Sequence, residues 1–142
     1  MALESHLVEP ASPLWTEHLK TVQYDVYHLP EYCELCGQFE KAEPLAFIAS
    51  EGGNVYFLPL LVRPIVIDGM STAELRDVAS PYGYAGPVVS PNAPADFIER
   101  SVTRFIETLS EHAIVTAFVR FHPVLTQASG RYQELGQLCD HG

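Results

Sequence analysis

The sequence predicts a mixed α/β domain, in which helices and strands alternate along a chain of 142 residues. Three segments indicate this class. Residues 95–112 have the apolar spacing of an amphipathic helix, residues 45–63 contain two strand-like runs around a glycine pair, and residues 114–121 are apolar and β-branched. A chain of this length fits one domain. We therefore expect a single domain over residues 1–142, with 126–142 as a weakly structured tail.

The first third of the chain predicts a helix, a strand and a second helix. Ser12-Pro13 suits the start of a helix that ends near Val22, because serine caps and proline is tolerated in the first turn. Residues 24–29 alternate like a strand, and Pro30 then begins another helix. The apolar stripe of that helix, which we expect to face the core, consists of Tyr32, Leu35, Cys36 and Phe39.

The middle of the chain predicts a hairpin. Residues 45–49 and 55–63 are strand-like, and Gly52-Gly53 between them suits a tight turn. Pro59 interrupts the second strand, which indicates an edge position or a bulge, because proline cannot donate to the ladder.

The last two elements are the clearest. The helix over 95–112 carries Asp96 and Arg100 four residues apart near its start, as an ion pair would require. Its apolar face comprises Phe97, Ile98, Val102, Phe105, Ile106 and Leu109. The continuous apolar run of 114–121 predicts a central strand covered on both faces.

Composition and charge exclude several classes of function. The net charge of −10 argues against binding to DNA or RNA phosphates, which depends on lysine and arginine. No apolar run approaches the roughly 20 residues of a membrane-spanning helix, and the start of the chain lacks the pattern of a signal peptide. We therefore expect a cytoplasmic protein. Neither a nucleophile elbow nor a phosphate-binding loop motif occurs, so a hydrolase or a nucleoside triphosphatase is not indicated.

Residues 80–87, Ser-Pro-Tyr-Gly-Tyr-Ala-Gly-Pro, predict a shaped loop and are named the tyrosine loop below. Its prolines fix φ, its glycines permit positive φ, and Tyr82 and Tyr84 offer rigid aromatic faces with a hydroxyl at the tip. Such a loop suits ligand contact, although a wide turn whose tyrosines cover the core has the same composition.

Two further segments accompany this loop, Asp-Val-Tyr-His-Leu-Pro-Glu-Tyr at 25–32 and Ala-Phe-Val-Arg-Phe-His-Pro at 117–123. In this order and spacing, the three segments resemble the first half of the FemAB-like branch of the GNAT acyltransferases. The resemblance covers about residues 12–125. It implies a GNAT-like mixed sheet flanked by helices and apparently incomplete at its C-terminus, because a further strand and a second GNAT-like half would follow.

The resemblance also implies a function. The chain would be the N-terminal part of a transferase that moves an acyl or aminoacyl group to an amine acceptor in cell-envelope or polysaccharide metabolism. Its donor would be acyl-CoA or aminoacyl-tRNA, and its acceptor a small molecule or a peptidoglycan precursor. Its partner would be the second half or a homodimer copy. However, the motif Arg/Gln-x-x-Gly-x-Gly/Ala, which holds the CoA pyrophosphate in GNAT enzymes, is absent. Donor binding by the isolated chain is therefore not indicated, and whether the chain is active alone stays open.

The candidate substrate-binding residues are Tyr82, Gly83, Tyr84, Gly86, Arg120 and His122. Arg120 and His122 are two positions apart, so both side chains should leave a strand on the same face. Together they could bind a carboxylate or phosphate and move a proton, or they could pair with an acid and cap the sheet edge. No catalytic residue is assigned.

The cysteines leave one alternative open. Cys33, Cys36, Cys139 and His141 are ligands of a type compatible with zinc, in two short spacings. Cys33 and Cys36 nevertheless fall within a helical pattern, where buried free cysteines are common, so we assign no metal. A second hypothesis for the whole chain is a non-catalytic binding or assembly module with the same fold.

Overall fold

The computed structural model describes residues 2–69 and 74–125, and these form one mixed sheet with helices on both faces. The predicted α/β class is confirmed. The sheet order is β1-β2-β3-β4-β6, with the short β5 paired to β3. Neighbouring strands are antiparallel except β4 and β6, which run parallel. The strands are β1 (Glu4–Val8), β2 (Glu43–Glu51), β3 (Asn54–Pro64), β4 (Arg76–Ala79), β5 (Val88–Val89) and β6 (Ile114–Phe118).

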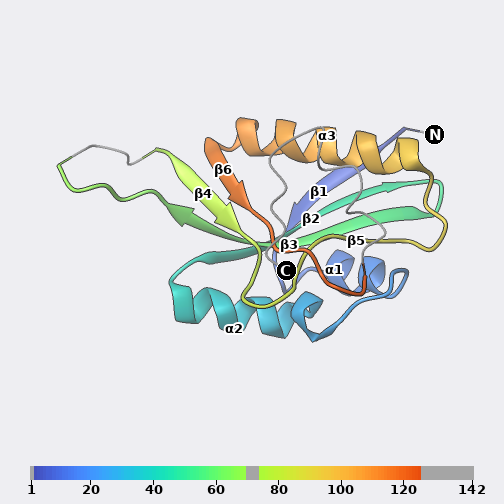
Figure 1. The fold of residues 1–142 in the computed structure, drawn as a ribbon, viewed down its shortest axis with the longest axis horizontal. Helices are drawn as coiled ribbons and strands as arrows, with labels where there is room; N and C mark the ends of the chain where they lie inside the picture. Colours follow the sequence, from blue (N-terminus) through green and yellow to red (C-terminus); the bar gives the residue numbers. More distant parts are fainter. Residues whose placement is uncertain (1, 70–73, 126–142) are drawn as a thin grey trace.

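The helices divide between the two faces of the sheet (Figure 1). Helix α3 (Ala95–Glu111) covers one face, and α1 (Pro13–Leu19) and α2 (Pro30–Glu40) cover the other. Strand β3 supplies both cores, because its side chains alternate between the faces. Tyr56, Leu58, Leu60 and Val62 join the core beneath α3, whereas Val55, Phe57 and Leu61 join the core beneath α1 and α2.

Several local predictions are confirmed. Ser12 caps α1 by accepting a hydrogen bond from Leu14 N–H, and Pro30 stands in the first turn of α2. The turn between β2 and β3 has positive φ at both Gly52 and Gly53, the conformation that a two-residue hairpin of this hand requires. In α3 the predicted apolar face is buried apart from Ile106, which is 42% exposed.

Two elements near the N-terminus differ from expectation. Strand β1 was not predicted, because Glu-Ser-His-Leu-Val carries a weak strand pattern; in the structure it pairs with β2 along its whole length. Residues 24–29 were predicted as a strand but contain a 3₁₀ turn, η1 (Val26–His28). The side chain of Asp25 caps this turn, and a local side-chain cap competes with the ladder of a strand.

Helix α2 buries only part of the predicted stripe: Cys36 is buried and Tyr32 packs against the core, as predicted, but the other two positions are not buried. Leu35 and Phe39 are 62% and 89% exposed, and the buried positions include Cys33, Cys36 and Gly37. A Cβ at Gly37 would lie 2.8 Å from the carbonyl oxygen of Ala42. The helix therefore packs through its smaller residues, and its large apolar side chains face outward.

The positions of two strands also correct the predictions. Strand β3 is central rather than at an edge, yet it accepts Pro59. On the side away from β2, β5 pairs with Tyr56 and Phe57 and β4 pairs from Leu61 onward, so Pro59 falls in the interval between them.

The predicted central strand over 114–121 ends at Phe118 and lies at the margin of the sheet in the described residues. Only Ile114 of this strand is buried, and Val115 and Phe118 are more than half exposed.

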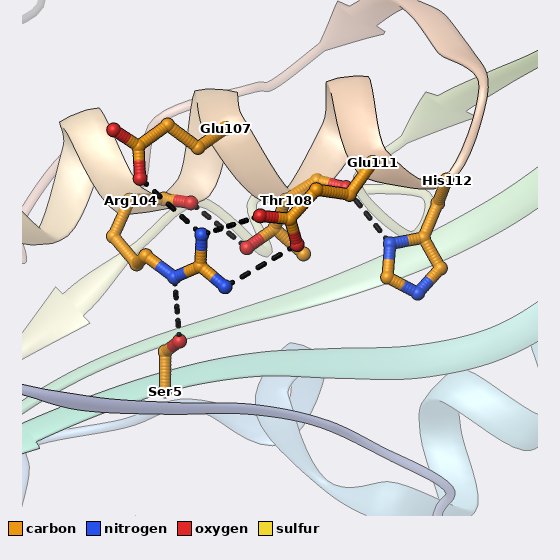
Figure 2. A network of polar contacts seen from close by, with 6 residues as sticks. All are labelled: Ser5, Arg104, Glu107, Thr108, Glu111 and His112. Atoms are coloured by element: carbon orange, nitrogen blue, oxygen red, sulfur yellow. Dashed lines mark hydrogen bonds and ion pairs between the residues drawn. The ribbon is translucent and has the colours of Figure 1, made fainter.

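Arg104 ties β1 to α3 (Figure 2). Its Nε–H donates to the Ser5 hydroxyl at 3.0 Å, and its Nη1 lies 2.8 Å from the Glu111 carboxylate. Because Ser5 belongs to the outermost strand on this side, the guanidinium joins the sheet edge to the helix above it.

None of the helices among the described residues is long and apolar enough to cross a membrane. The predicted tail, 126–142, lies outside the described residues.

Candidate substrate-binding site

The tyrosine loop lies where the parallel strands β4 and β6 end. Strand β4 ends at Ala79 opposite Phe118, and Ser80 then bridges to the other chain segment. The Ser80 N–H donates to the Phe118 carbonyl at 2.9 Å, and the Ser80 hydroxyl accepts from Arg120 N–H at 3.0 Å. The loop therefore starts from a fixed point between the two strands.

Both glycines of the predicted site are required by close packing. Gly83 has φ of +90°, and a Cβ there would lie 2.5 Å from the ring of Tyr27. Gly86 lies so near the following segment that a Cβ would be 2.7 Å from the Arg120 carbonyl oxygen. A side chain at either position would collide, so both positions require glycine for contact, and Gly83 requires it for conformation as well.

His28 holds the loop from the α2 side. It is fully buried; its Nδ1 accepts a hydrogen bond from Asp25 N–H at 3.0 Å, so its Nε2 carries the proton. Nε2–H then donates to the Gly86 carbonyl at 2.9 Å. Burial lowers the pKa of His28 below its ordinary value, which keeps the ring neutral and preserves both bonds.

His122 is fixed in a similar way and is 8% exposed. Its Nδ1 accepts from the backbone N–H groups of Val124 and Leu125, each at 3.1 Å, so Nε2 carries the proton and donates to Asp25 at 2.9 Å. This hydrogen bond, with a smaller contribution from Val26 N–H, lowers the pKa of Asp25. Both ring nitrogens are engaged, so the hypothesis that His122 moves a proton loses support in favour of its role as a cap.

The aromatic rings form a cluster around Tyr27. The Tyr32 and Tyr84 rings meet the Tyr27 ring edge to face, with centroids 5.5 and 6.1 Å away. The His122 ring lies 6.4 Å from the rings of both Tyr27 and Tyr84. The Tyr32 hydroxyl donates to the Tyr82 carbonyl at 2.7 Å, and burial, with the nearby Cys36, raises its pKa to about 12. Segments 25–32, 80–87 and 118–122 are thus brought together.

A cavity of about 240 Å³ lies beside the first half of the tyrosine loop, where β4 and β6 end. Arg120, Tyr82 and Phe118 line it and are exposed. Glu40 and Arg63 also line it, and the predicted site did not include them. Arg63 is held by Asp77 at 3.0 Å and by Glu40 at 3.6 Å. For Arg120, by contrast, no carboxylate within the described ranges lies within ion-pair distance.

The predicted site is therefore assembled in part. Tyr82, Gly83 and Arg120 line the cavity, whereas Tyr84, Gly86 and His122 are not part of its lining: Tyr84 packs against His122, and Gly86 accepts the hydrogen bond of His28. The prediction that Arg120 and His122 share a face was wrong, because the strand ends before them and His122 turns inward to Asp25. Asp25 was not predicted as a site residue, although segment 25–32 was singled out in the sequence. The hydrogen bond of Asp25 to His122, a residue 97 positions away, leaves no local sequence pattern.

A larger cavity, of about 520 Å³, lies elsewhere, beside α1 and the turn from β2 to β3. Its carboxylates include Glu4, Glu17 and Glu51, and Glu51 is already bound by Arg100 at 2.6 Å. Size alone favours this cavity. The geometry favours the smaller one, because the tyrosine loop and Arg120 line it, and the Arg120 guanidinium has no ion-pair partner among the described residues.

The cysteines of the zinc alternative are buried in α2. The Cys33 thiol is 3.6 Å from the Leu60 carbonyl, and burial raises its pKa to about 12, which opposes the thiolate that zinc requires. Cys139 and His141 lie outside the described residues.

The start of α3 does not fit the pyrophosphate of CoA. Its cap is Pro94, which has no N–H, and its first turn carries the carboxylate of Asp96. An anion at this helix end would meet that carboxylate, whose partner Arg100 is also bound to Glu51. The described residues offer no glycine-rich cradle in its place.

The arrangement can bind a ligand through aromatic faces and one guanidinium. It offers little for acid–base chemistry through histidine, because all four ring nitrogens of His28 and His122 are engaged. The site is accordingly a candidate for binding and orienting a substrate.

Comparison with known proteins adds the fold. No family model matches the sequence, and no curated protein matches it. Among solved structures, the ribosomal-protein-alanine N-acetyltransferase from Brucella melitensis biovar Abortus 2308 is similar, with a TM-score of 0.58 and 12% sequence identity. The alignment covers 100% of this chain and 96% of that chain. At this identity the similarity concerns the fold alone, and the chain has the GNAT-type fold.

Proposed function

We propose that the chain binds the amine acceptor in a GNAT-type transferase that moves an acyl or aminoacyl group. The observation that carries the proposal is the convergence of the tyrosine loop, Arg120 and segment 25–32 at the end of the parallel pair β4 and β6. The GNAT-type fold is consistent with acyl transfer. The FemAB-like role in cell-envelope or polysaccharide metabolism rests on the sequence resemblance.

In this proposal the donor, acyl-CoA or aminoacyl-tRNA, is held by another protein or domain. Asp96 at the start of α3 opposes the CoA pyrophosphate, and the net charge of −10 opposes a tRNA backbone. The chain's own residues would bind and orient the acceptor: the Tyr82 and Tyr84 rings by contact, and Arg120 by charge. His28 and His122 would hold the loop that carries these rings.

Binding of small primary amines tests the proposal. The purified chain is screened by saturation-transfer-difference NMR against amino acids, amino sugars and dipeptides. We expect some of these amines to give saturation-transfer signals that become weaker in Tyr84→Ala, a position where the wild-type side chain is 44% exposed. The signals should be unchanged in the control variant Lys20→Ala, which lies at the end of α1. Hits equally strong in Tyr84→Ala would remove the site assignment.

A second function, a non-catalytic assembly module, is favoured by one specific observation. Val115 and Phe118, on opposite faces of β6, are both exposed at the margin of the described sheet, where a partner chain would cover them. Light scattering distinguishes the two. A dimer that Phe118→Ser converts to a monomer would favour the assembly module, whereas a monomer with amine-dependent signals favours the transferase.

A further inference from the structure

The two arginines that line the 240 Å³ cavity, Arg63 and Arg120, differ in whether a carboxylate already binds them. Among the described arginines, Arg63, Arg100 and Arg104 each have a carboxylate partner, and Arg76 donates to the His112 carbonyl at 2.7 Å. Arg63 and Glu40 therefore neutralise each other at the cavity wall. Arg120 is the guanidinium there without a described partner.

The backbone of Arg120 is held on both sides. Its N–H donates to the Ser80 hydroxyl, and its carbonyl is in close contact with Gly86, so the residue cannot shift as a surface loop would. Its side chain lines the cavity together with Tyr82 and Phe118, which are 75% and 61% exposed. A planar group with five donors thus extends from a fixed backbone position and lines the same cavity as two aromatic side chains.

The size of the cavity limits what it can hold. Sites for whole drug-sized ligands occupy roughly 300–1,000 Å³. At about 240 Å³ this cavity fits one end group of a ligand, with the remainder outside. The chemistry of Arg120 suits an oxyanion, which a guanidinium binds through two parallel hydrogen bonds.

We propose that this cavity binds the oxyanionic end, a carboxylate or a phosphate, of a ligand whose adjoining body packs against Tyr82. The inference rests on the proposed function, because it assigns an acidic group to the amine acceptor. It implies that amines without an acidic group bind more weakly than amines that also carry a carboxylate or a phosphate.

NMR of the arginine Nε–H groups tests this directly in the isotope-labelled full chain. The probes are sodium acetate, inorganic phosphate and sodium benzoate, each against sodium chloride at equal ionic strength. We expect a saturable shift of the Arg120 signal, assigned by its loss in Arg120→Lys. The signals of Arg63, Arg100 and Arg104 serve as internal controls, because each Nε–H already has an acceptor. Whichever of acetate and phosphate binds more tightly names the oxyanion.

Two variants separate the roles of charge and ring. Arg120→Lys keeps the charge but loses the fork, and should weaken oxyanion binding by roughly ten-fold or more. Because this variant has no Arg120 Nε–H, its binding and that of the wild type are compared through the backbone amide signals of the tyrosine loop, residues 80–87. Benzoate should bind about two- to ten-fold more tightly than acetate, and Tyr82→Ala should abolish that difference.

The inference is overturned if all arginine signals drift together without saturation, or if Arg120→Lys binds both oxyanions as tightly as the wild type. Amine binding that still depends on Tyr84 would in that event leave the proposed function standing. If instead the Arg120 signal still shows saturable oxyanion binding but amine binding does not depend on Tyr84, the proposed function is removed and the oxyanion site remains.

Discussion

Asp25 and His122, 97 positions apart, are joined by a 2.9 Å hydrogen bond from Nε2–H to the carboxylate. The same aspartate caps the 3₁₀ turn that carries Tyr27 and His28, and the same histidine caps the backbone after β6. One side-chain pair therefore couples the two segments between which the tyrosine loop lies.

Asp25→Ala should loosen this coupling. It leaves His122 Nε2–H without its acceptor and uncaps the turn, at a cost of about 1 kcal/mol, since the Asp25 side chain is 45% exposed. Urea denaturation measures the change. Asp25→Asn, which retains an acceptor oxygen, should lose less. Equal stability of Asp25→Ala and wild type would contradict a coupling role.

Acid should destabilise the fold through His28. Its pKa is lowered in the folded state, so between its ordinary value of 6.5 and the folded value the unfolded chain binds more protons. Stability should therefore fall as the pH decreases through 6.5. Asp25 adds a further loss below 3.8, because its own pKa is lowered by His122.

Unfolding of wild type and His28→Gln at pH 7.5 and at pH 5.5, assay conditions that bracket a histidine pKa of roughly 6.5, measures this effect. The difference in unfolding free energy between the two pH values should be smaller in His28→Gln than in the wild type. It should be unchanged in His6→Gln, which replaces an exposed histidine on β1. An unchanged difference in His28→Gln would refute the assignment to His28.

Gly83→Ala should destabilise through contact as well as conformation. Gly53 is the matched control, because its φ of +85° is close to +90° at Gly83 but nothing lies within 4 Å of its missing Cβ. Gly53→Ala should cost roughly 1–2 kcal/mol for conformation, and Gly83→Ala a further 1–3 kcal/mol for the collision with Tyr27.

Thermal unfolding of both single variants and of the double variant Gly83→Ala/Tyr27→Ala separates the two contributions. The double variant should cost less than the sum of its parts, because the collision is gone. Strict additivity would show that Gly83 and Tyr27 do not interact.

Tyr56→Phe should stabilise the protein or leave it unchanged. The Tyr56 hydroxyl is fully buried, and no polar atom in the described part of the chain is its hydrogen-bond partner. Removing it should gain up to about 1 kcal/mol, because an unpaired buried polar group is costly. Tyr24→Phe, at a side chain 47% exposed, is the control. A clear loss of stability in Tyr56→Phe would mean that the hydroxyl has a partner.

Features that local chemistry determines could be predicted from the sequence. The Gly52-Gly53 turn, the proline starts of α1 and α2, and the ion pair between Asp96 and Arg100 depend on neighbouring residues alone. The role of the glycines in shaping the tyrosine loop was also predicted. Their close contacts with Tyr27 and Arg120 could not be predicted, because these residues are distant in the sequence.

Features that tertiary contacts determine could not be predicted in this way. The alternation over 24–29 indicated a strand, but a cap at Asp25 and a buried bond from His28 to Gly86 favour a turn. Leu35 and Phe39 matched a helical stripe, but α2 packs closely through Gly37 instead. For Arg120 and His122, strand alternation did not apply, because β6 ends at Phe118.

Amide NMR mapping of the best-binding amine on the full chain tests the location of the site most directly. We expect the largest shifts in residues 80–87 and 118–122, around the cavity that Tyr82 and Arg120 line. Shifts concentrated at Gly52–Val55 beside the 520 Å³ cavity, or at the start of α3, would contradict the assignment of the acceptor site to the tyrosine loop.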